Sequence, residues 1–388
     1  MREHKRVSLI ILLLLIASIG FPSCIYFRMK RAKDVLKLQD TTQRVMKPKS
    51  AFSDSVKIDY LGCGGFMIEY SGETIMIDPY FTNISVSKIV TSEYRSDTAL
   101  INHFFLKKTG QVYDENGKIE NILLSHAHHD HLADIPALLK NNLKNDLIQV
   151  YGSRTAINIL RSFSNLVADT DKQYHDLEQA FHTINDNDPM LNKPQISSFE
   201  YSSKRKMRFA AIPSLHAGHF HFFKGQKLPF IGGHINQPLK NPPTRAMQYK
   251  EGQNFNYLID LLDSGGRVVY RIFSNAGSAS DKGVGFPPES VLKERNVDLL
   301  LICGANYDVA KDYPEALIDY LKPQSLFVAH WENFFKPIPH LQRRPEIVPN
   351  TNIKRLMKKL VNFSKKRGYP KSIFIEKPIE KPLILQIK

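Results

Sequence analysis

Cysteine is scarce in this chain of 388 residues, which contains only three, namely Cys24, Cys63 and Cys303. Three widely spaced cysteines provide no disulfide framework, and no Cys-x-x-Cys pair is present to bind a metal ion. The fold is therefore expected to depend on its hydrophobic core rather than on cross-links. With 42% hydrophobic residues, the chain can bury one large core or two modest ones.

Acidic residues are outnumbered, with 38 Asp and Glu against 53 Lys and Arg, which gives a net charge of +15. Such a surface suits an anionic neighbour, which can be a phospholipid headgroup, a phosphorylated substrate or a nucleic acid. Part of the excess is local, in residues 28–33 and 354–367. Aromatic residues do not interleave with these clusters, which disfavours nucleic acid as a partner. A solvated basic face with no dedicated ligand remains an alternative.

The longest uncharged apolar segment extends from Val7 to Phe27 and follows three basic residues. Its length is just sufficient for one helix to cross a bilayer. Residues 1–27 are therefore predicted to be a signal or membrane anchor, with three alternatives. The segment is an uncleaved anchor, a cleaved secretory signal, or a lipoprotein signal with Cys24 as the lipidated residue. Basic residues flank both ends of the segment, so the sequence does not decide on which side of the membrane the rest of the chain lies.

The rest of the chain divides into a polar tether over residues 28–55 and one domain over residues 56–388. Period-two alternation and helical periodicity predict the regular elements, and no internal repeat is visible. Long polar stretches at 80–118 and 160–205 are predicted to be irregular. The predicted strands are 56–61, 66–70, 74–79, 121–125, 207–212, 256–262, 267–273, 297–302 and 325–329, and the predicted helices are 132–140, 314–321 and 353–363.

A dense group of potential metal ligands lies at residues 126–131, with the spacing His-x-His-x-Asp-His. His126 and His128 follow a predicted strand, and two residues spaced by two on an extended segment point to the same side. Asp130 and His131 follow as the chain turns into a helix, and they can face a second position. Imidazole and carboxylate ligands suit zinc, iron or manganese. A histidine-rich surface loop that binds metal incidentally is the alternative.

Three segments together resemble the metallo-β-lactamase superfamily of metal-dependent hydrolases. They are the motif at 126–131, the predicted hairpin at 64–79, and Ala329-His330-Trp331-Glu332-Asn333-Phe334. The last segment is similar to the N-acylphosphatidylethanolamine phospholipase D-like and lactonase-like branches. The resemblance covers about residues 56–335. It implies an α/β fold, an αββα sandwich with helices outside two sheets.

The resemblance also implies a two-position metal centre for one or two zinc ions, with Mn2+ and Fe2+ as alternatives. His126, His128 and His216 would hold the first ion, and Asp130, His131 and His330 would hold the second. His216 and His330 each follow a predicted strand, as the motif does. Each also has an ordinary alternative as a core or surface histidine.

One position departs from the pattern of the superfamily. Its bridging aspartate lies in a turn that corresponds to Ser274-Asn275-Ala276-Gly277, so Asn275 replaces the carboxylate. A neutral amide offers one oxygen but does not neutralise two cations. The second position is therefore expected to be the weaker one, because Asp130 is its only anionic ligand. Three alternatives remain: a dinuclear site with a weakly bound second metal, a mononuclear enzyme, and a member of the superfamily with impaired catalysis.

The resulting functional hypothesis is hydrolysis by a metal-bound hydroxide that Asp130 orients. The net positive charge and the predicted anchor favour a phosphodiester or phospholipid as the substrate. A lactone or other ester is the alternative substrate. A third hypothesis is a metal-binding protein whose catalysis is impaired by Asn275. The expected partners are a small-molecule or lipid substrate and a membrane, and the oligomeric state stays open.

Overall fold

The structure is a computed structural model that describes most of the chain beyond residue 54. The predicted signal or anchor at 1–27 and all but the last residue of the tether lie outside the described residues. Within the described part, no helix is both long and apolar enough to cross a bilayer. The described ranges are 55–109, 119–142, 148–164, 180–184, 196–218, 231–277, 284–349 and 351–387.

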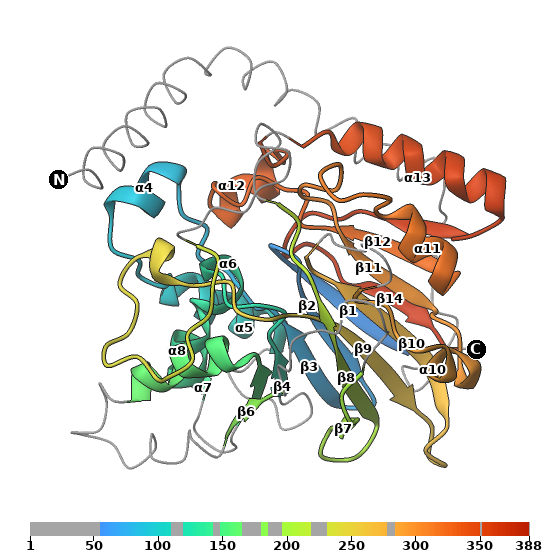
Figure 1. Cartoon of the computed structure of the whole chain (residues 1–388), viewed down its shortest axis with the longest axis horizontal. Coiled ribbons are helices and arrows are strands. Elements are labelled where there is room, and N and C mark those ends of the chain that lie inside the picture. Colours follow the sequence, from blue (N-terminus) through green and yellow to red (C-terminus); the bar gives the residue numbers. More distant parts are fainter. Residues whose placement is uncertain are drawn as a thin grey trace.

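The first of two mixed sheets is built around the predicted N-terminal hairpins (Figure 1). The strands from β14 to β3 pair antiparallel, and those from β3 to β6 pair parallel. In spatial order the strands are β14 (Leu383–Gln386), β1 (Ser55–Gly62), β2 (Gly65–Tyr70), β3 (Glu73–Ile77), β4 (Ile119–Leu123), β5 (Gln149–Gly152) and β6 (Phe181–Thr183).

The second sheet repeats this arrangement with later segments of the chain. The strands from β7 to β10 pair antiparallel, and those from β10 to β13 pair parallel. In spatial order the strands are β13 (Ser372–Phe374), β12 (Ser325–Ala329), β11 (Leu299–Cys303), β10 (Val268–Asn275), β9 (Asn254–Leu262), β8 (Met207–Ser214) and β7 (Glu200–Tyr201). All the predicted strands are confirmed, with shifts of a few residues at their ends.

Alternating side chains explain why both faces of each sheet are covered. Phe66 and Ile68 of β2 point into the core between the sheets, whereas Met67 points to the outer face of the first sheet. In β11, Leu301 points inward and Leu300 points to the outer face of the second sheet. A strand with apolar residues on both faces must be packed on both sides.

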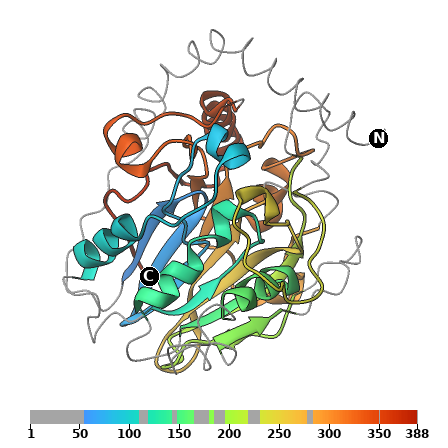
Figure 2. The same ribbon diagram turned by 90° about the vertical axis from the view of Figure 1, so that its left-hand side faces the viewer.

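Helices supply the two outer layers, so the predicted α/β class and αββα sandwich are confirmed (Figures 1 and 2). The first sheet is covered by α5, α7 and α8, and the second by α10, α11 and α13. The helices are α4 (Val86–Thr91), α5 (Thr98–Thr109), α6 (His129–Leu132), α7 (Ile135–Asn142), α8 (Arg154–Ser164), α10 (Glu289–Glu294), α11 (Glu315–Leu321), α12 (Ile338–Arg343) and α13 (Ile353–Arg367), with a 3-10 turn η4 (Ala246–Gln248).

Three predictions need correction. Residues 80–118 are not irregular throughout, since α4 and α5 form there, and 160–205 includes β6, β7 and the end of α8. Only Ile101 and Phe104 of the described α5 side chains are buried, which leaves little periodicity to detect. The helix predicted at 132–140 begins at Ile135, after the separate short helix α6.

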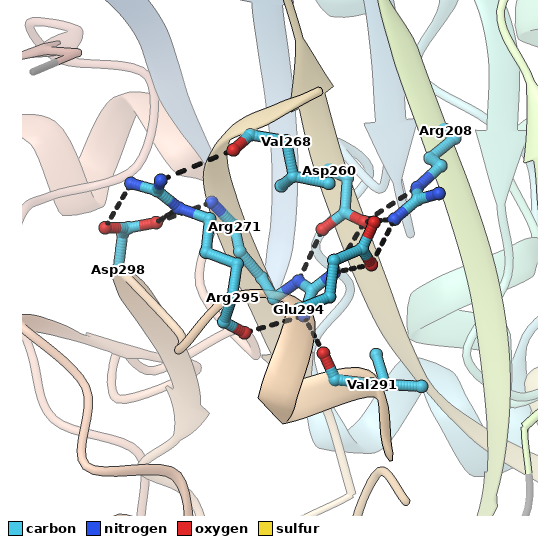
Figure 3. Close-up of polar contacts among 8 residues, drawn as sticks. All are labelled: Arg208, Asp260, Val268, Arg271, Val291, Glu294, Arg295 and Asp298. Carbon is cyan, nitrogen blue, oxygen red and sulfur yellow. Dashed lines mark hydrogen bonds and ion pairs between the residues drawn. The ribbon is translucent and has the colours of Figure 1, made fainter. Parts of the chain in front are cut away.

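A buried ion-pair network joins α10 to the outer face of the second sheet (Figure 3). The fully buried Arg271 donates from Nε and Nη2 to the Asp260 carboxylate at 2.6 and 2.8 Å, and Arg208 donates to the same carboxylate at 2.8 Å. Nη1 of Arg271 donates to the carbonyl oxygens of Val291 and Arg295 at 2.5 and 2.7 Å. The planar guanidinium satisfies several acceptors at once and fixes α10 on β10.

Candidate metal centre

The predicted ligands come from chain segments that directly follow three strands in the two sheets. The motif begins after β4, where His126 and His128 precede the short helix α6, which carries Asp130 and His131. His216 follows β8 and His330 follows β12. Segments after strands are held by the sheet behind them, which keeps such ligands in place.

The first group consists of His126, His128 and His216, whose candidate ligand atoms all lie within 4.8 Å of one another. The ring centroid of His216 lies 4.9 Å from that of His126 and 5.0 Å from that of His128. Nδ1 of His216 lies 2.6 Å from the carbonyl oxygen of Ala217. Because a carbonyl only accepts, Nδ1 carries the proton, and Nε2 of His216 keeps its lone pair for a ligand.

The second group consists of Asp130, His131 and His330, again with ligand atoms within 4.8 Å of one another. Oδ2 of Asp130 lies 3.6 Å from Nε2 of His330 and 3.8 Å from Nε2 of His131. The two groups are adjacent, because the ring centroids of His126 and His131 are 4.0 Å apart. The structure thus gathers six predicted residues into two neighbouring groups. That they bind metal stays a prediction.

Burial and mutual charge set the protonation of the two groups. Burial, together with the neighbouring imidazoles, lowers the pKa of His126 well below its usual value. Burial opposes ionisation of Asp130, but His131 and His330 outweigh it and hold the pKa of that carboxyl well below its usual range. Burial also lowers the pKa of His131, yet Asp78 and Asp130 reverse this and raise it. A neutral His126 and an ionised Asp130 are the forms that bind cations.

The donor set fits a divalent metal ion. Nε2 of His126 is buried and has no hydrogen-bond partner among the described residues. A buried polar atom in that condition is costly unless something else satisfies it. The five imidazoles and one carboxylate are ligands that suit zinc, and also manganese or iron. A metal ion at these positions would remove that cost.

Asp78 supports both groups through hydrogen bonds, a role that the sequence did not indicate. Its fully buried carboxylate accepts a hydrogen bond from the Ser125 amide at 2.7 Å and another from the Ser125 hydroxyl. It lies 2.9 Å from Nδ1 of His131, and the Ser125 hydroxyl lies 2.9 Å from Nδ1 of His126. Partners of this kind fix ring orientation and tautomer. The available signal was an acidic residue directly after an apolar strand.

Tyr60 and Glu332 support His330 in a similar way. The Tyr60 hydroxyl accepts a hydrogen bond from the His330 amide at 2.7 Å and donates to the Glu332 carboxylate at 2.5 Å. The other oxygen of Glu332 accepts from the Cys63 amide at 2.6 Å. Glu332 is fully buried, and its two oxygens are satisfied by these donors. The pair ties the turn after β1 to the segment that carries His330.

Glycine is required in the turn between β1 and β2, next to the second group. Gly64 has φ of 78°, and a Cβ atom there would lie 3.7 Å from Cδ2 of His330. A Cβ atom on Gly65 would lie 2.4 Å from the carbonyl oxygen of Asp78. This close approach of two backbones leaves no room for a larger residue. The predicted turn thus packs directly against the candidate metal centre.

Asn275 occupies the last position of β10, and it is buried. Its side-chain amide donates to Oδ1 of Asn256 at 3.2 Å. The turn that follows contacts the first group, because the Ala217 amide donates to the Gly277 carbonyl at 2.7 Å. A Cβ atom on Gly277 would lie 2.7 Å from the carbonyl oxygen of Leu215. The segment thus lies beside His216, and a role for Asn275 as a ligand stays a prediction.

Comparison with known proteins finds one family model that is similar to the middle of the chain. Residues 73–237 match the model of the beta-lactamase superfamily domain. No curated protein matches the chain.

Solved structures with a similar arrangement include three from different organisms. Igni18, a metallo hydrolase from Ignicoccus hospitalis, is 14% identical with a TM-score of 0.43. The metallo-β-lactamase fold protein YhfI from Bacillus subtilis is 13% identical with a TM-score of 0.40. Yeast PDE1 is 10% identical with a TM-score of 0.44. In each case the match covers 86% of this chain and 100% of the other. Likenesses at this level carry no information about the substrate.

Proposed function

We propose that this chain is a metal-dependent hydrolase of the metallo-β-lactamase superfamily, and that it is a zinc-dependent phosphodiesterase that acts on a phospholipid. The observation that carries the proposal is the pair of adjacent ligand groups after β4, β8 and β12. We further propose that residues 1–27 attach the enzyme to a membrane, where such a substrate is found.

In the proposed mechanism the two groups would hold one or two metal ions, and residues of the chain would position the reacting water. A bound divalent ion lowers the pKa of water and polarises the substrate oxygen. Asp130 would be the catalytic residue, because its ionised carboxylate lies next to both histidines of the second group and could accept a hydrogen bond from the attacking water. Asp78 and Tyr60 keep His131 and His330 in place through their hydrogen bonds.

Charge favours a phosphodiester over a neutral ester. The chain carries a net charge of +15, and Asp130 is the single carboxylate in the two ligand groups. If divalent ions bind at a centre with a single carboxylate, the centre keeps a net positive charge. An anionic substrate offsets this charge better than a neutral lactone does. A lactone or other ester is the alternative substrate class.

Asn275 supports a second candidate function, a metal-binding protein with impaired catalysis. An amide at the end of β10 does not supply the negative charge that a bridging carboxylate contributes. In that case the first group binds metal and the second stays weakly loaded. Metal content and turnover, measured on the same preparation, distinguish the two functions.

The test uses the full-length chain, purified in detergent and loaded with zinc. Metal content is measured by atomic emission, and turnover is measured with a chromogenic phosphodiester, a dispersed phospholipid and a generic lactone. His128→Ala removes a ligand of the first group, and His182→Ala is the matched control. His182 lies on β6 at the edge of the first sheet and stacks on Tyr151, with ring centroids 4.5 Å apart.

We expect bound zinc, turnover of the phosphodiester and phospholipid, and loss of both zinc and turnover in His128→Ala alone. Zinc without turnover of any substrate would support the protein with impaired catalysis. Turnover of the lactone alone would mean that the substrate is a lactone rather than a phosphodiester. Absence of zinc would overturn the metal centre itself.

A further inference from the structure

Helix α13 carries charge of one sign only. Its 15 residues include no acidic side chain, and no acidic residue lies in its first turn. Positive charge near a helix N-terminus opposes the helix dipole, so helix stability does not explain the basic residues at that end. The basic residues are Lys354, Arg355, Lys358, Lys359, Lys365, Lys366 and Arg367.

The apolar side of α13 is already occupied by the protein core. Ile353, Leu356, Met357 and Leu360 are buried against the outer face of the second sheet. The basic side therefore faces away from the protein. Arg355, Lys358, Lys359 and residues 365–367 are exposed.

Two of these exposed charges are paired within the fold. Lys359 pairs with Glu315 at 2.5 Å, and Arg367 pairs with Asp319 at 2.9 Å, both on the neighbouring helix α11. Arg355, Lys358, Lys365 and Lys366 form no ion pair with the described part of the chain. We call these four residues the basic face of α13.

Helix α13 lies on the same side of the molecule as α12, the helix that follows His330 along the chain. In Figures 1 and 2, α13 lies at the top together with α4 and α12, and β7 lies at the bottom. Helix α12 follows closely after His330 along the chain. A binding partner that contacts α13 would therefore approach the side of the molecule on which α12 lies, and not the side on which β7 lies.

We propose that the basic face of α13 docks on an anionic lipid bilayer and orients the domain there. The proposal rests on the proposed attachment of residues 1–27 to a membrane, which brings the domain within reach of lipid headgroups. Each basic residue near an anionic surface strengthens association roughly fivefold, so four together give a substantial bias. Phe363, the single aromatic residue of α13, packs partly against the core and is therefore a poor platform for stacked bases, which favours lipid over nucleic acid.

The test is lysine footprinting of the full-length chain added to preformed vesicles. The vesicles contain phosphatidylcholine alone or phosphatidylcholine mixed with phosphatidylglycerol. Acetylation rates of Lys358, Lys365 and Lys366 are followed by mass spectrometry, with Lys204 in the turn between β7 and β8 as the internal reference. No step depends on catalysis, so an inactive protein does not affect the result.

We expect acetylation of the basic face to slow at least threefold in anionic vesicles relative to neutral ones, with no change at Lys204. The protection should disappear in about 1 M salt, where the Debye length is about 3 Å. Equal rates in both vesicles, or equal protection of Lys204, would overturn the proposal. Protection by an added RNA or duplex DNA, without protection by anionic vesicles, would overturn it in favour of nucleic acid.

A variant with neutral glutamines at all four positions provides the second measurement, with Lys359 as its reporter. The vesicles should no longer protect Lys359 in this variant, because the charge that attracts the bilayer is gone. A control variant that neutralises four exposed basic residues elsewhere should keep the protection, and its failure to do so would indicate a general effect of net charge. The control replaces Arg205, Lys240, Arg267 and Lys293 with glutamine, so that Lys204 remains as the reference.

Discussion

Asp78→Asn tests how the second group is kept ready for a metal ion. Three donors converge on the Asp78 carboxylate, namely the Ser125 amide, the Ser125 hydroxyl and Nδ1–H of His131. Because a carboxylate only accepts, Nδ1 of His131 must carry the proton, and its Nε2 faces Asp130. The backbone of Asp78 has φ of 42°, which asparagine tolerates as well as aspartate does.

The size of the effect follows from counting acceptors. An asparagine offers one oxygen, and the Ser125 hydroxyl can reverse to accept from the new amide. Either the Ser125 amide or Nδ1–H of His131 then loses its partner. Losing a hydrogen bond to a charged group costs about 1.5–3 kcal/mol of stability. If His131 changes tautomer to avoid this loss, its Nε2 no longer binds metal, and affinity falls about 10- to 100-fold, or roughly 1.4–2.7 kcal/mol.

The assay is a zinc titration of the metal-free full-length chain against a competing chelator, together with urea unfolding of the same preparation. The control is Asp134→Asn, another fully buried aspartate. Asp134 accepts from the Phe81 and Thr82 amides on one oxygen at 2.8 Å and from the Tyr94 hydroxyl on the other at 2.5 Å. Asparagine satisfies all three donors there, because the hydroxyl can reverse. Unchanged zinc affinity in Asp78→Asn, or an equal loss in the control, would refute the reasoning.

Four further predictions address the surroundings of the centre. Asn275→Asp should raise affinity for a second zinc ion in the chelator titration, and cost the metal-free protein about 1–2 kcal/mol because the amide that donates to Asn256 is lost. Tyr60→Phe should cost about 1–3 kcal/mol in urea unfolding and weaken the second zinc ion, since two buried hydrogen bonds disappear. Arg271→Ala leaves the buried Asp260 carboxylate paired with Arg208 alone and should cost about 3–5 kcal/mol in the same assay, with zinc affinity unchanged. Burial and neighbouring imidazoles lower the pKa of His126, so metal-free protein should lose stability as pH falls below 6.5, and His126→Asn should lose less in pH-dependent unfolding.

The parts of the fold that the sequence predicted are those set by local pattern. Strands with residues that alternate between two apolar layers, such as β2 and β11, follow from period-two spacing. The motif at 126–131 is visible because its ligands are adjacent along the chain. By contrast, α5 is formed by tertiary packing of two described side chains, Ile101 and Phe104, and its sequence gives no periodic signal.

The supporting residues of the centre depend on contacts that no local pattern contains. Tyr60 and Glu332 are 272 positions apart in the chain, and their hydrogen bond forms only when β1 and the segment after β12 meet at the same end of the sandwich. Asp78 meets Ser125 in the same way, because β3 and β4 are parallel neighbours whose ends coincide. Ligands can be recognised by residue type and spacing, whereas residues that orient them are defined by the completed fold.

The departure at Asn275 changes charge without changing the framework of the centre. The turn that follows it still holds the segment of His216, through the hydrogen bond from Ala217 to Gly277. Ligands of the first group therefore keep their positions whether residue 275 is an amide or a carboxylate. The difference would fall on the second position, where Asp130 is the single carboxylate that could offset the charge of bound ions. An enzyme of this kind gains more from an anionic substrate than one with a bridging carboxylate. The same reasoning implies that Asn275→Asp should lower the preference for a phosphodiester over a lactone, even as it strengthens the second metal.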